Sequence, residues 1–133
     1  MSGSFLRPLL HESSSKLVIR NLRNQSRVAY DLVAAFDSKT RRTGLLRHKA
    51  LPEGSAMLIA PTNAVHTFFM RFPIDIAFVT REGRVVKTCG TLPPWRVAAA
   101  LGAHAVVELP AGTLARCDTV VGDVLAILPD EQV

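Results

Sequence analysis

The segment from His66 to Val79 places basic, aromatic and acidic side chains in a stretch that is otherwise apolar enough to form core. Within it, Asp75 lies between two isoleucines, Ile74 and Ile76. A polar side chain carried into an apolar wall must be hydrogen-bonded or paired, because an unpaired buried charge is costly. The segment therefore predicts either a ligand site or a structural ion pair.

A second carboxylate, Glu108, repeats this pattern between Val107 and Leu109. Two carboxyls that face each other in apolar surroundings can serve as acid and base, because burial and mutual repulsion separate their pKa values. Glu108 and Asp75 would form such a site if the fold brings them together. In the alternative interpretation, Asp75 forms a buried ion pair with an arginine. The candidate partners are Arg41, Arg47 and Arg71.

His66 opens the segment and is the candidate general acid, since histidine titrates near neutral pH. Its competing role is a hydrogen bond to a backbone group. No serine or cysteine stands in a nucleophile-elbow context, no glycine pattern resembles a phosphate loop, and no second histidine lies at metal-ligand spacing from His66. We therefore expect no metal and no cofactor.

Trp95, the single tryptophan, follows Pro93 and Pro94 in what is expected to be a surface loop. An exposed indole often closes a ligand or partner pocket, and the competing role is packing as a lid over the core. The candidate ligand-binding residues are Arg41, Arg47, His66, Phe68, Met70, Arg71, Asp75, Trp95 and Glu108.

Length and composition favour one small globular domain. The chain has 133 residues, of which 48% are hydrophobic and 20% charged, a balance typical of globular proteins. Residues 1–15 combine Pro8 with a run of serines and are expected to form a flexible tail, which leaves 16–133 for the domain. This tail lacks the basic and apolar regions of a secretory signal, and no apolar run is long enough for a membrane span. We therefore expect a cytoplasmic protein.

Positive charge is concentrated in the first third of the chain. Residues 16–49 hold nine Lys or Arg against two acids, whereas the rest of the chain is close to neutral. Such a field can attract nucleic acid or another acidic partner. Only Tyr30 and Phe36 interleave with these bases, and single-strand recognition usually needs more aromatic residues. We therefore do not expect nucleic acid as the partner.

The hydrophobic pattern mostly alternates with period two between turn residues, which is typical of β-strands. A short helix is expected from Ser38 or Thr40 to Lys49 and one helical turn from Thr113, and Gly83 fits the left-handed position of a hairpin. The expected strands cover 17–22, 28–36, 57–60, 74–80, 84–87, 105–109 and 124–128. These elements predict a mainly β single domain: an antiparallel β-sandwich, jelly-roll-like or barrel-like, with one or two short helices.

The same residues carry a resemblance to a known family. The pattern includes Arg41-x-x-Gly44-Leu45-Leu46, His66-Thr67-Phe68-x-Met70-Arg71-Phe72-Pro73-Ile74-Asp75, Pro94-Trp95-Arg96, Glu108-Leu109-x-Ala111-Gly112 and Gly122-Asp123. In this order it resembles the family called domain of unknown function 192, over residues 17–128. The resemblance implies a mainly β fold of sandwich or jelly-roll type, a bacterial origin and no established activity. Many relatives carry a leader peptide, which implies an association with the cell envelope for them, whereas this chain has only the polar tail at its N-terminus.

We predict a non-catalytic binding module in which these groups line one pocket for a small polar ligand or a partner segment. The pocket would be formed by the edge with Arg41 and Arg47, the His66–Arg71 loop, the Trp95 loop and Glu108. The first alternative is a small hydrolase or lyase that uses Asp75 or Glu108 as base and His66 as acid. A lesser alternative is nucleic-acid binding through the basic residues 16–49.

Overall fold

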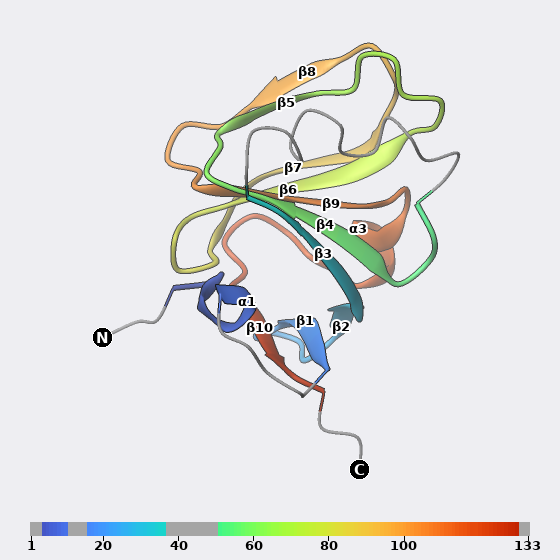
Figure 1. Ribbon diagram of the computed structural model, residues 1–133. Helices are drawn as coiled ribbons and strands as arrows, with labels where there is room; N and C mark the ends of the chain where they lie inside the picture. The colour runs from blue at the N-terminus through green and yellow to red at the C-terminus, as the bar shows by residue number, and fades with distance from the viewer. Residues whose placement is uncertain (1–3, 11–15, 37–50, 131–133) are drawn as a thin grey trace.

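The strands of this protein are stacked in layers, as the computed structural model shows (Figure 1). The structure describes residues 4–10, 16–36 and 51–130. The strands are β1 (Leu17–Asn21), β2 (Arg27–Ala29), β3 (Asp31–Ala35), β4 (Ser55–Ile59), β5 (Ala64–His66), β6 (Ile74–Val79), β7 (Val85–Leu92), β8 (Val97–Ala99), β9 (Ala105–Pro110) and β10 (Leu125–Pro129). The helices among the described residues are α1 (Arg7–Leu10) and α3 (Thr113–Arg116).

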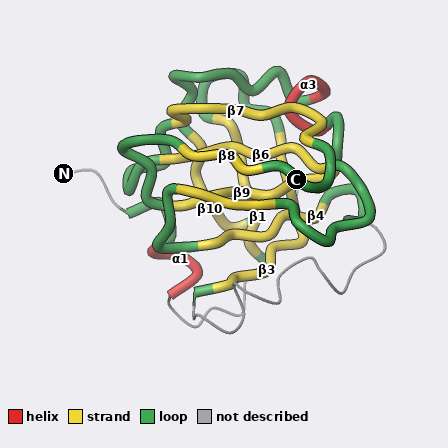
Figure 2. Tube along the Cα trace, turned by 90° about the horizontal axis from the view of Figure 1, so that it is seen from above, coloured by secondary structure: helices red, strands yellow, loops and turns green. Residues whose placement is uncertain are grey.

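A five-stranded sheet forms the middle layer, in the order β3-β4-β9-β6-β7. On one side lies a three-stranded sheet, β10-β1-β2, and on the other a two-stranded arm, β5-β8. Seen from above, α1 and α3 lie toward opposite ends of these layers (Figure 2). The mainly β, sandwich-like fold predicted from the sequence is confirmed, and the described strands do not close into a barrel.

The middle sheet is buried on both faces at its central strands, which accordingly are short apolar runs rather than alternating ones, whereas the outer strands β3 and β7 are largely exposed or half-buried. Every residue of β4 and β6 is buried, and so are the first five residues of β9. One face packs against the three-stranded sheet in a core that includes Ile19, Val107 and Leu125. The other face packs beneath the arm through residues such as Ile76 and Phe78.

One predicted strand, 28–36, is divided between two sheets. The chain turns at Tyr30, whose N–H donates to the Gly54 carbonyl over 2.8 Å. The Tyr30 ring lies so close that a Cβ at Gly54 would be 2.1 Å from it. β3 then runs parallel to β4, so the middle sheet is mixed rather than wholly antiparallel. Residues 36–54 separate β3 from β4 in the sequence, which is long enough for the crossover that a parallel pair needs.

Most of the other predicted strands are present close to their expected bounds, but β7 continues to Leu92, five residues beyond the predicted end at Lys87. Gly83 has the expected left-handed backbone, with φ +94°, and a Cβ there would lie 2.2 Å from the Leu125 carbonyl oxygen. The helical turn expected from Thr113 is α3. β5 and β8 were not predicted, because three residues each are too few to show a period. The helix predicted to end at Lys49 lies outside the described residues.

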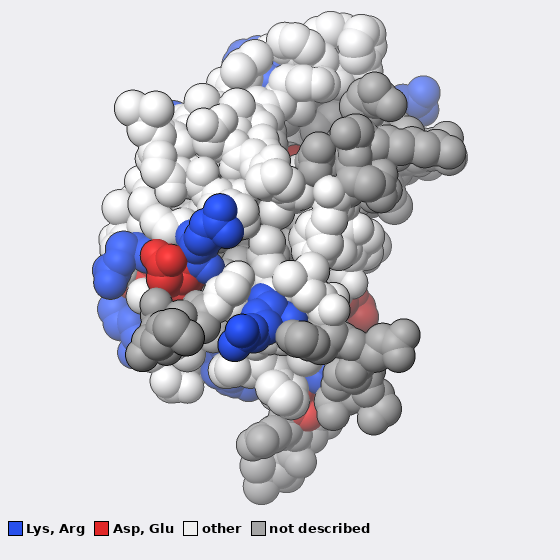
Figure 3. Space-filling model, turned by 60° about the vertical axis from the view of Figure 1, so that its left-hand side comes forward, with Lys and Arg blue, Asp and Glu red and all other residues white. Residues whose placement is uncertain are grey.

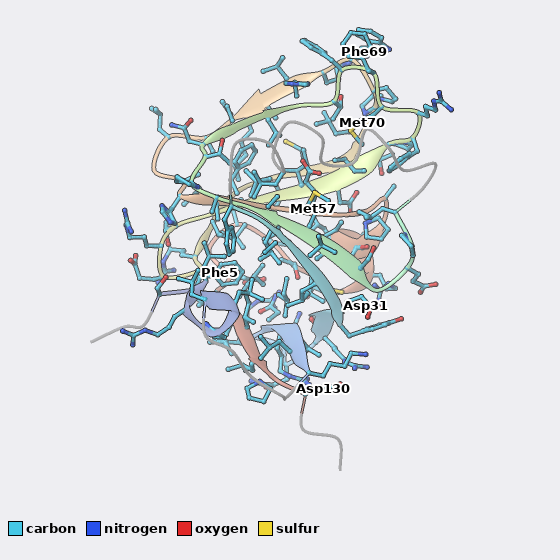
Figure 4. The ribbon with its side chains drawn as sticks, in the orientation of Figure 1. Phe5, Asp31, Met57, Phe69, Met70 and Asp130 are labelled. Atoms are coloured by element: carbon cyan, nitrogen blue, oxygen red, sulfur yellow. The ribbon has the colours of Figure 1, made fainter. Side chains whose placement is uncertain are left out.

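The N-terminal segment differs from the predicted flexible tail where the structure describes it. Phe5 and Leu6 are buried in the core below the middle sheet, and Figure 4 shows Phe5 beside α1. The Phe5 N–H also donates to the Arg81 carbonyl over 2.7 Å. The sequence did not predict this burial, because an isolated apolar pair beside Pro8 shows no periodicity. Burying a side chain of this size nevertheless contributes about 1.5–3 kcal/mol to the stability of the fold.

Candidate functional site

An aromatic cluster of His66, Phe68, Phe69 and Trp95 covers one end of the arm. The His66 and Phe68 rings stack with centroids 4.9 Å apart, and Phe68 stacks on Trp95 at 5.8 Å. Phe69 meets Trp95 edge-on at 4.6 Å, at the outermost point of the arm in Figure 4. Phe69 and Trp95 remain 67% and 56% exposed. The cluster therefore presents contiguous apolar surface to solvent, a feature of interaction sites.

Thr67 joins the two loops that carry the cluster. Its hydroxyl donates to the Pro93 carbonyl over 2.7 Å and accepts from the Arg96 N–H over 2.9 Å. Its carbonyl accepts from the Trp95 N–H over 2.9 Å, and its own N–H donates to the Arg96 carbonyl over 2.8 Å. Thr67 is buried, so these bonds are shielded from water. The aromatic side chains consequently lie on two loops that hydrogen bonds hold together.

Two residues of the cluster have left-handed backbone, with φ 66° at Phe69 and φ 67° at Trp95. This conformation costs a residue with a side chain about 1–2 kcal/mol. Both side chains are largely exposed, so burial does not offset that cost. Strained residues of this kind concentrate at functional sites, which makes the cluster a candidate binding surface.

Replacing Thr67 with valine should loosen the cluster while keeping the shape of the side chain. The Arg96 N–H and the Pro93 carbonyl lose their partner, so we expect a loss of about 1–3 kcal/mol in the free energy of unfolding. The fluorescence anisotropy of Trp95 should fall as its loop becomes mobile. The control is Thr88→Val on β7, whose hydroxyl has no hydrogen-bond partner within the described ranges. Equal anisotropy in the two variants would contradict the joining role of Thr67.

Asp75 is a structural residue on the lower face of the middle sheet. It is 1% exposed, and its two oxygens accept hydrogen bonds from the Thr91 N–H at 2.7 Å and the Leu114 N–H at 2.9 Å. None of the salt bridges between described residues involves Asp75. The predicted ion pair with Arg71 is therefore not formed, because backbone donors from β7 and α3 already satisfy the carboxylate.

Glu108 lies on the opposite face of the sheet, beneath the arm. Its cross-strand neighbours are Met57 and Ile76, and it is 5% exposed. No residue in the described part of the chain hydrogen-bonds its carboxylate. Burial in this apolar layer raises the pKa of Glu108 to about 7.

The pairing of Asp75 with Glu108, which the sequence left open, does not occur. Asp75 is opposite Leu109 in the β6–β9 ladder, and Glu108 is opposite Ile76. Since side chains alternate along a strand, Asp75 and Glu108 point to opposite faces of the sheet. This arrangement separates the acid and base that the sequence could have supplied.

The other predicted site residues are distributed around the arm. His66, Phe68 and Trp95 are brought together, and the Phe68 N–H donates to His66 Nδ1 over 3.3 Å. Met70 is buried and points from the arm toward the middle sheet, facing Met57 (Figure 4). Arg71 is exposed. The predicted edge with Arg41 and Arg47 lies outside the described residues.

Two residues of the site, Thr67 and Phe69, were not predicted. A threonine among apolar residues is ordinary in a strand, and Phe69 is one of several phenylalanines in its segment. Their roles depend on a buried hydroxyl and on the sign of a backbone angle. Neither the burial of a hydroxyl group nor the sign of a backbone angle can be predicted from the residue types in this segment. The nearest signal in the sequence is the density of aromatic residues beside Arg71.

The far end of the arm has a second, weaker feature. A shallow groove there is lined by Pro61, Thr62, Asn63, Ala103 and His104. Burial lowers the pKa of His104, and the charge of Arg81 acts in the same direction. No group of three His, Cys, Asp or Glu side chains in the described ranges could hold a metal ion, and no helix there could span a bilayer. The aromatic cluster remains the strongest candidate site.

Comparisons with known proteins identify a fold and no activity. The family model of domain of unknown function 192, described as Uncharacterized ACR, matches residues 19–127. No curated protein matches the chain. A crystal structure of a protein of unknown function from Novosphingobium aromaticivorans is 21% identical, with a TM-score of 0.71 over 83% of this chain and 82% of that one. The structure of a proposed transcription regulator from Sinorhizobium meliloti is 19% identical, with a TM-score of 0.73 over 88% and 98%.

Proposed function

This chain belongs to the domain of unknown function 192 family, as its sequence motifs predicted, and we propose its function from its own surface. We infer that it is a non-catalytic binding module, which takes a small polar ligand or a partner segment on the aromatic cluster. The observation that carries this proposal is the exposure of Phe69 and Trp95 on strained backbone, held in place by Thr67. Such a pre-organised surface lowers the entropic cost of binding.

The surroundings of the polar candidates support binding over catalysis. Each Asp75 oxygen already accepts a backbone hydrogen bond, on the face of the sheet away from the arm. Among the described residues no second acid acts on Glu108, whose pKa is raised by burial alone, and His66 is exposed and stacked on Phe68. A hydrolase or lyase would need these groups within hydrogen-bond reach of one another.

The emission of Trp95 should report binding, because it is the only tryptophan and lies within the cluster. We would titrate the protein with sugars, nucleotides, carboxylic acids and short peptides while following that emission. At least one class should shift it, and the Phe69→Gly variant should lose the response. Glycine adopts a positive φ without strain, so this variant should keep its stability within about 1 kcal/mol.

The control for this test is Val33→Ala, which removes an exposed apolar side chain from β3, outside the arm. Its response to the same compounds should equal that of the natural protein. If Phe69→Gly loses more than about 2 kcal/mol while no compound shifts the emission, the cluster is a structural lid and the proposed function is wrong.

A further inference from the structure

The outer edge of β8 exposes part of its backbone. The Ala100 N–H donates to the Asn63 carbonyl over 2.9 Å, and the Thr67 N–H donates to the Arg96 carbonyl over 2.8 Å. These two bonds flank the β5–β8 ladder and fix which residues of β8 turn their backbone groups toward β5. In an antiparallel pair, alternate residues turn their N–H and C=O groups away from the partner strand. In β8 these residues are Val97 and Ala99.

Three of these outward backbone groups have no hydrogen-bond partner among the residues that the structure describes. The Lys87 ammonium group donates to the Ala99 carbonyl over 2.9 Å. The Ala99 N–H and both the N–H and C=O of Val97 have no hydrogen-bond partner within the described part of the chain. A row of donor, acceptor and donor along a strand edge is the pattern that an added strand binds.

The side chains along this edge are apolar and exposed. Val97 is 64% exposed, Ala99 is also exposed, and Trp95 with Phe69 stands where the strand begins. The edge therefore combines main-chain groups for affinity with an aromatic surface for the side chains of an extended segment. This is the combination used in strand-addition complexes.

The charged side chains that the described residues place beside this edge are positive. Lys87 contacts β8 directly, Arg96 precedes it, and Arg71 follows the aromatic residues of the facing loop. None of the salt bridges between described residues involves these three cations. Residues 54–74 and 83–107 contain no Asp or Glu. In Figure 3 the upper part of the visible face has scattered blue and only a trace of red, whereas blue and red lie together lower down.

We propose that this edge binds an extended, acidic segment of a partner protein as an added strand beside β8. The inference rests on the proposed function of the aromatic cluster and names its partner class. The Val97 and Ala99 N–H groups would donate to carbonyls of the segment, and the Val97 carbonyl would accept from it. Apolar side chains of the segment would pack on Trp95 and Phe69, with its carboxylates beside the unpaired cations.

Other occupants fit the same surface less well. A second copy of this chain would bring two sets of cations together at β8, which is repulsive. Single-stranded nucleic acid needs free aromatic faces, whereas Phe68 lies between His66 and Trp95 in the cluster. An acidic peptide uses the backbone edge as well as the charge, which neither a bilayer nor a nucleic acid can do.

The test is selection from a display library of random twelve-residue peptides on the full chain. The selected peptides should be rich in Asp and Glu alternating with apolar residues. They should shift Trp95 emission and protect the Val97 and Ala99 amides from hydrogen exchange. Val97→Pro removes an outward N–H that makes no bond to β5, and replaces an exposed side chain, so it should fold while weakening these peptides at least about tenfold. Arg96→Glu should weaken them similarly, and Arg84→Glu, on the exposed β6–β7 turn, should not.

Three outcomes would overturn the proposal in different ways. In the first outcome, the selected peptides shift Trp95 emission but bind Val97→Pro equally well and do not protect the two amides. Binding by an added strand would then be wrong, and the proposed function would still hold. If no acidic peptide is selected, and oligothymidylate or vesicles of anionic lipid bind in its place, the partner class is wrong. If none of these probes and no compound shifts Trp95 emission, both proposals fail.

Discussion

Replacing Asp75 with alanine is expected to lower the free energy of unfolding by about 3–5 kcal/mol. The carboxylate accepts from the Thr91 N–H, in the irregular end of the β6–β7 pairing, and from the Leu114 N–H in the first turn of α3. Both donors would be left without a partner next to a buried strand. Urea denaturation of the variant measures the loss directly.

Two further variants separate this cause from a general effect of removing charge. Asp75→Asn keeps one acceptor oxygen and should recover about half of the loss. Asp31→Ala removes an exposed carboxylate whose ion pair with Lys16 spans 3.8 Å, and should cost less than about 1 kcal/mol. A loss below about 1 kcal/mol for Asp75→Ala would mean that its two hydrogen bonds do not support the fold.

Glu108 should make stability fall as the pH rises. Its pKa is raised from 4.5 to about 7 by burial, so the folded state holds a proton that the unfolded state has already released. The favourable contribution of the neutral acid is complete below pH 4.5 and is lost by the time the pH exceeds the folded pKa. The total loss is about 3 kcal/mol.

Urea denaturation at a series of pH values, compared with Glu108→Gln, isolates this contribution. The glutamine variant cannot ionise there, so its stability relative to the natural protein should increase by about 3 kcal/mol between pH 4.5 and 8. Glu53→Gln, which removes an exposed carboxyl, should leave the pH dependence unchanged. Parallel curves for the natural protein and Glu108→Gln would mean that the Glu108 carboxylate is stabilised in its charged form.

The sequence determined the fold class and most of the strands, because alternation and turn residues act locally. Gly83 was identified as a left-handed hairpin residue, and the strand from Ile74 was recognised as apolar on both faces. The density of aromatic and polar residues from His66 onward also marked the segment that carries most of the candidate site. These features need only the period of a strand and the conformational freedom of glycine.

Tertiary structure alone decided which of the marked residues act together. Whether Asp75 and Glu108 meet depends on the register of β6 on β9, and that register sends them to opposite faces. The joining role of Thr67 and the exposure of Phe69 depend on contacts with residues 93–96, which lie 26 to 29 residues from Thr67 in the sequence. Residue types determine which side chains are polar or apolar, but long-range pairing determines which of them become neighbours. In this protein the pairing brought aromatic side chains together on the arm and kept the two buried acids apart.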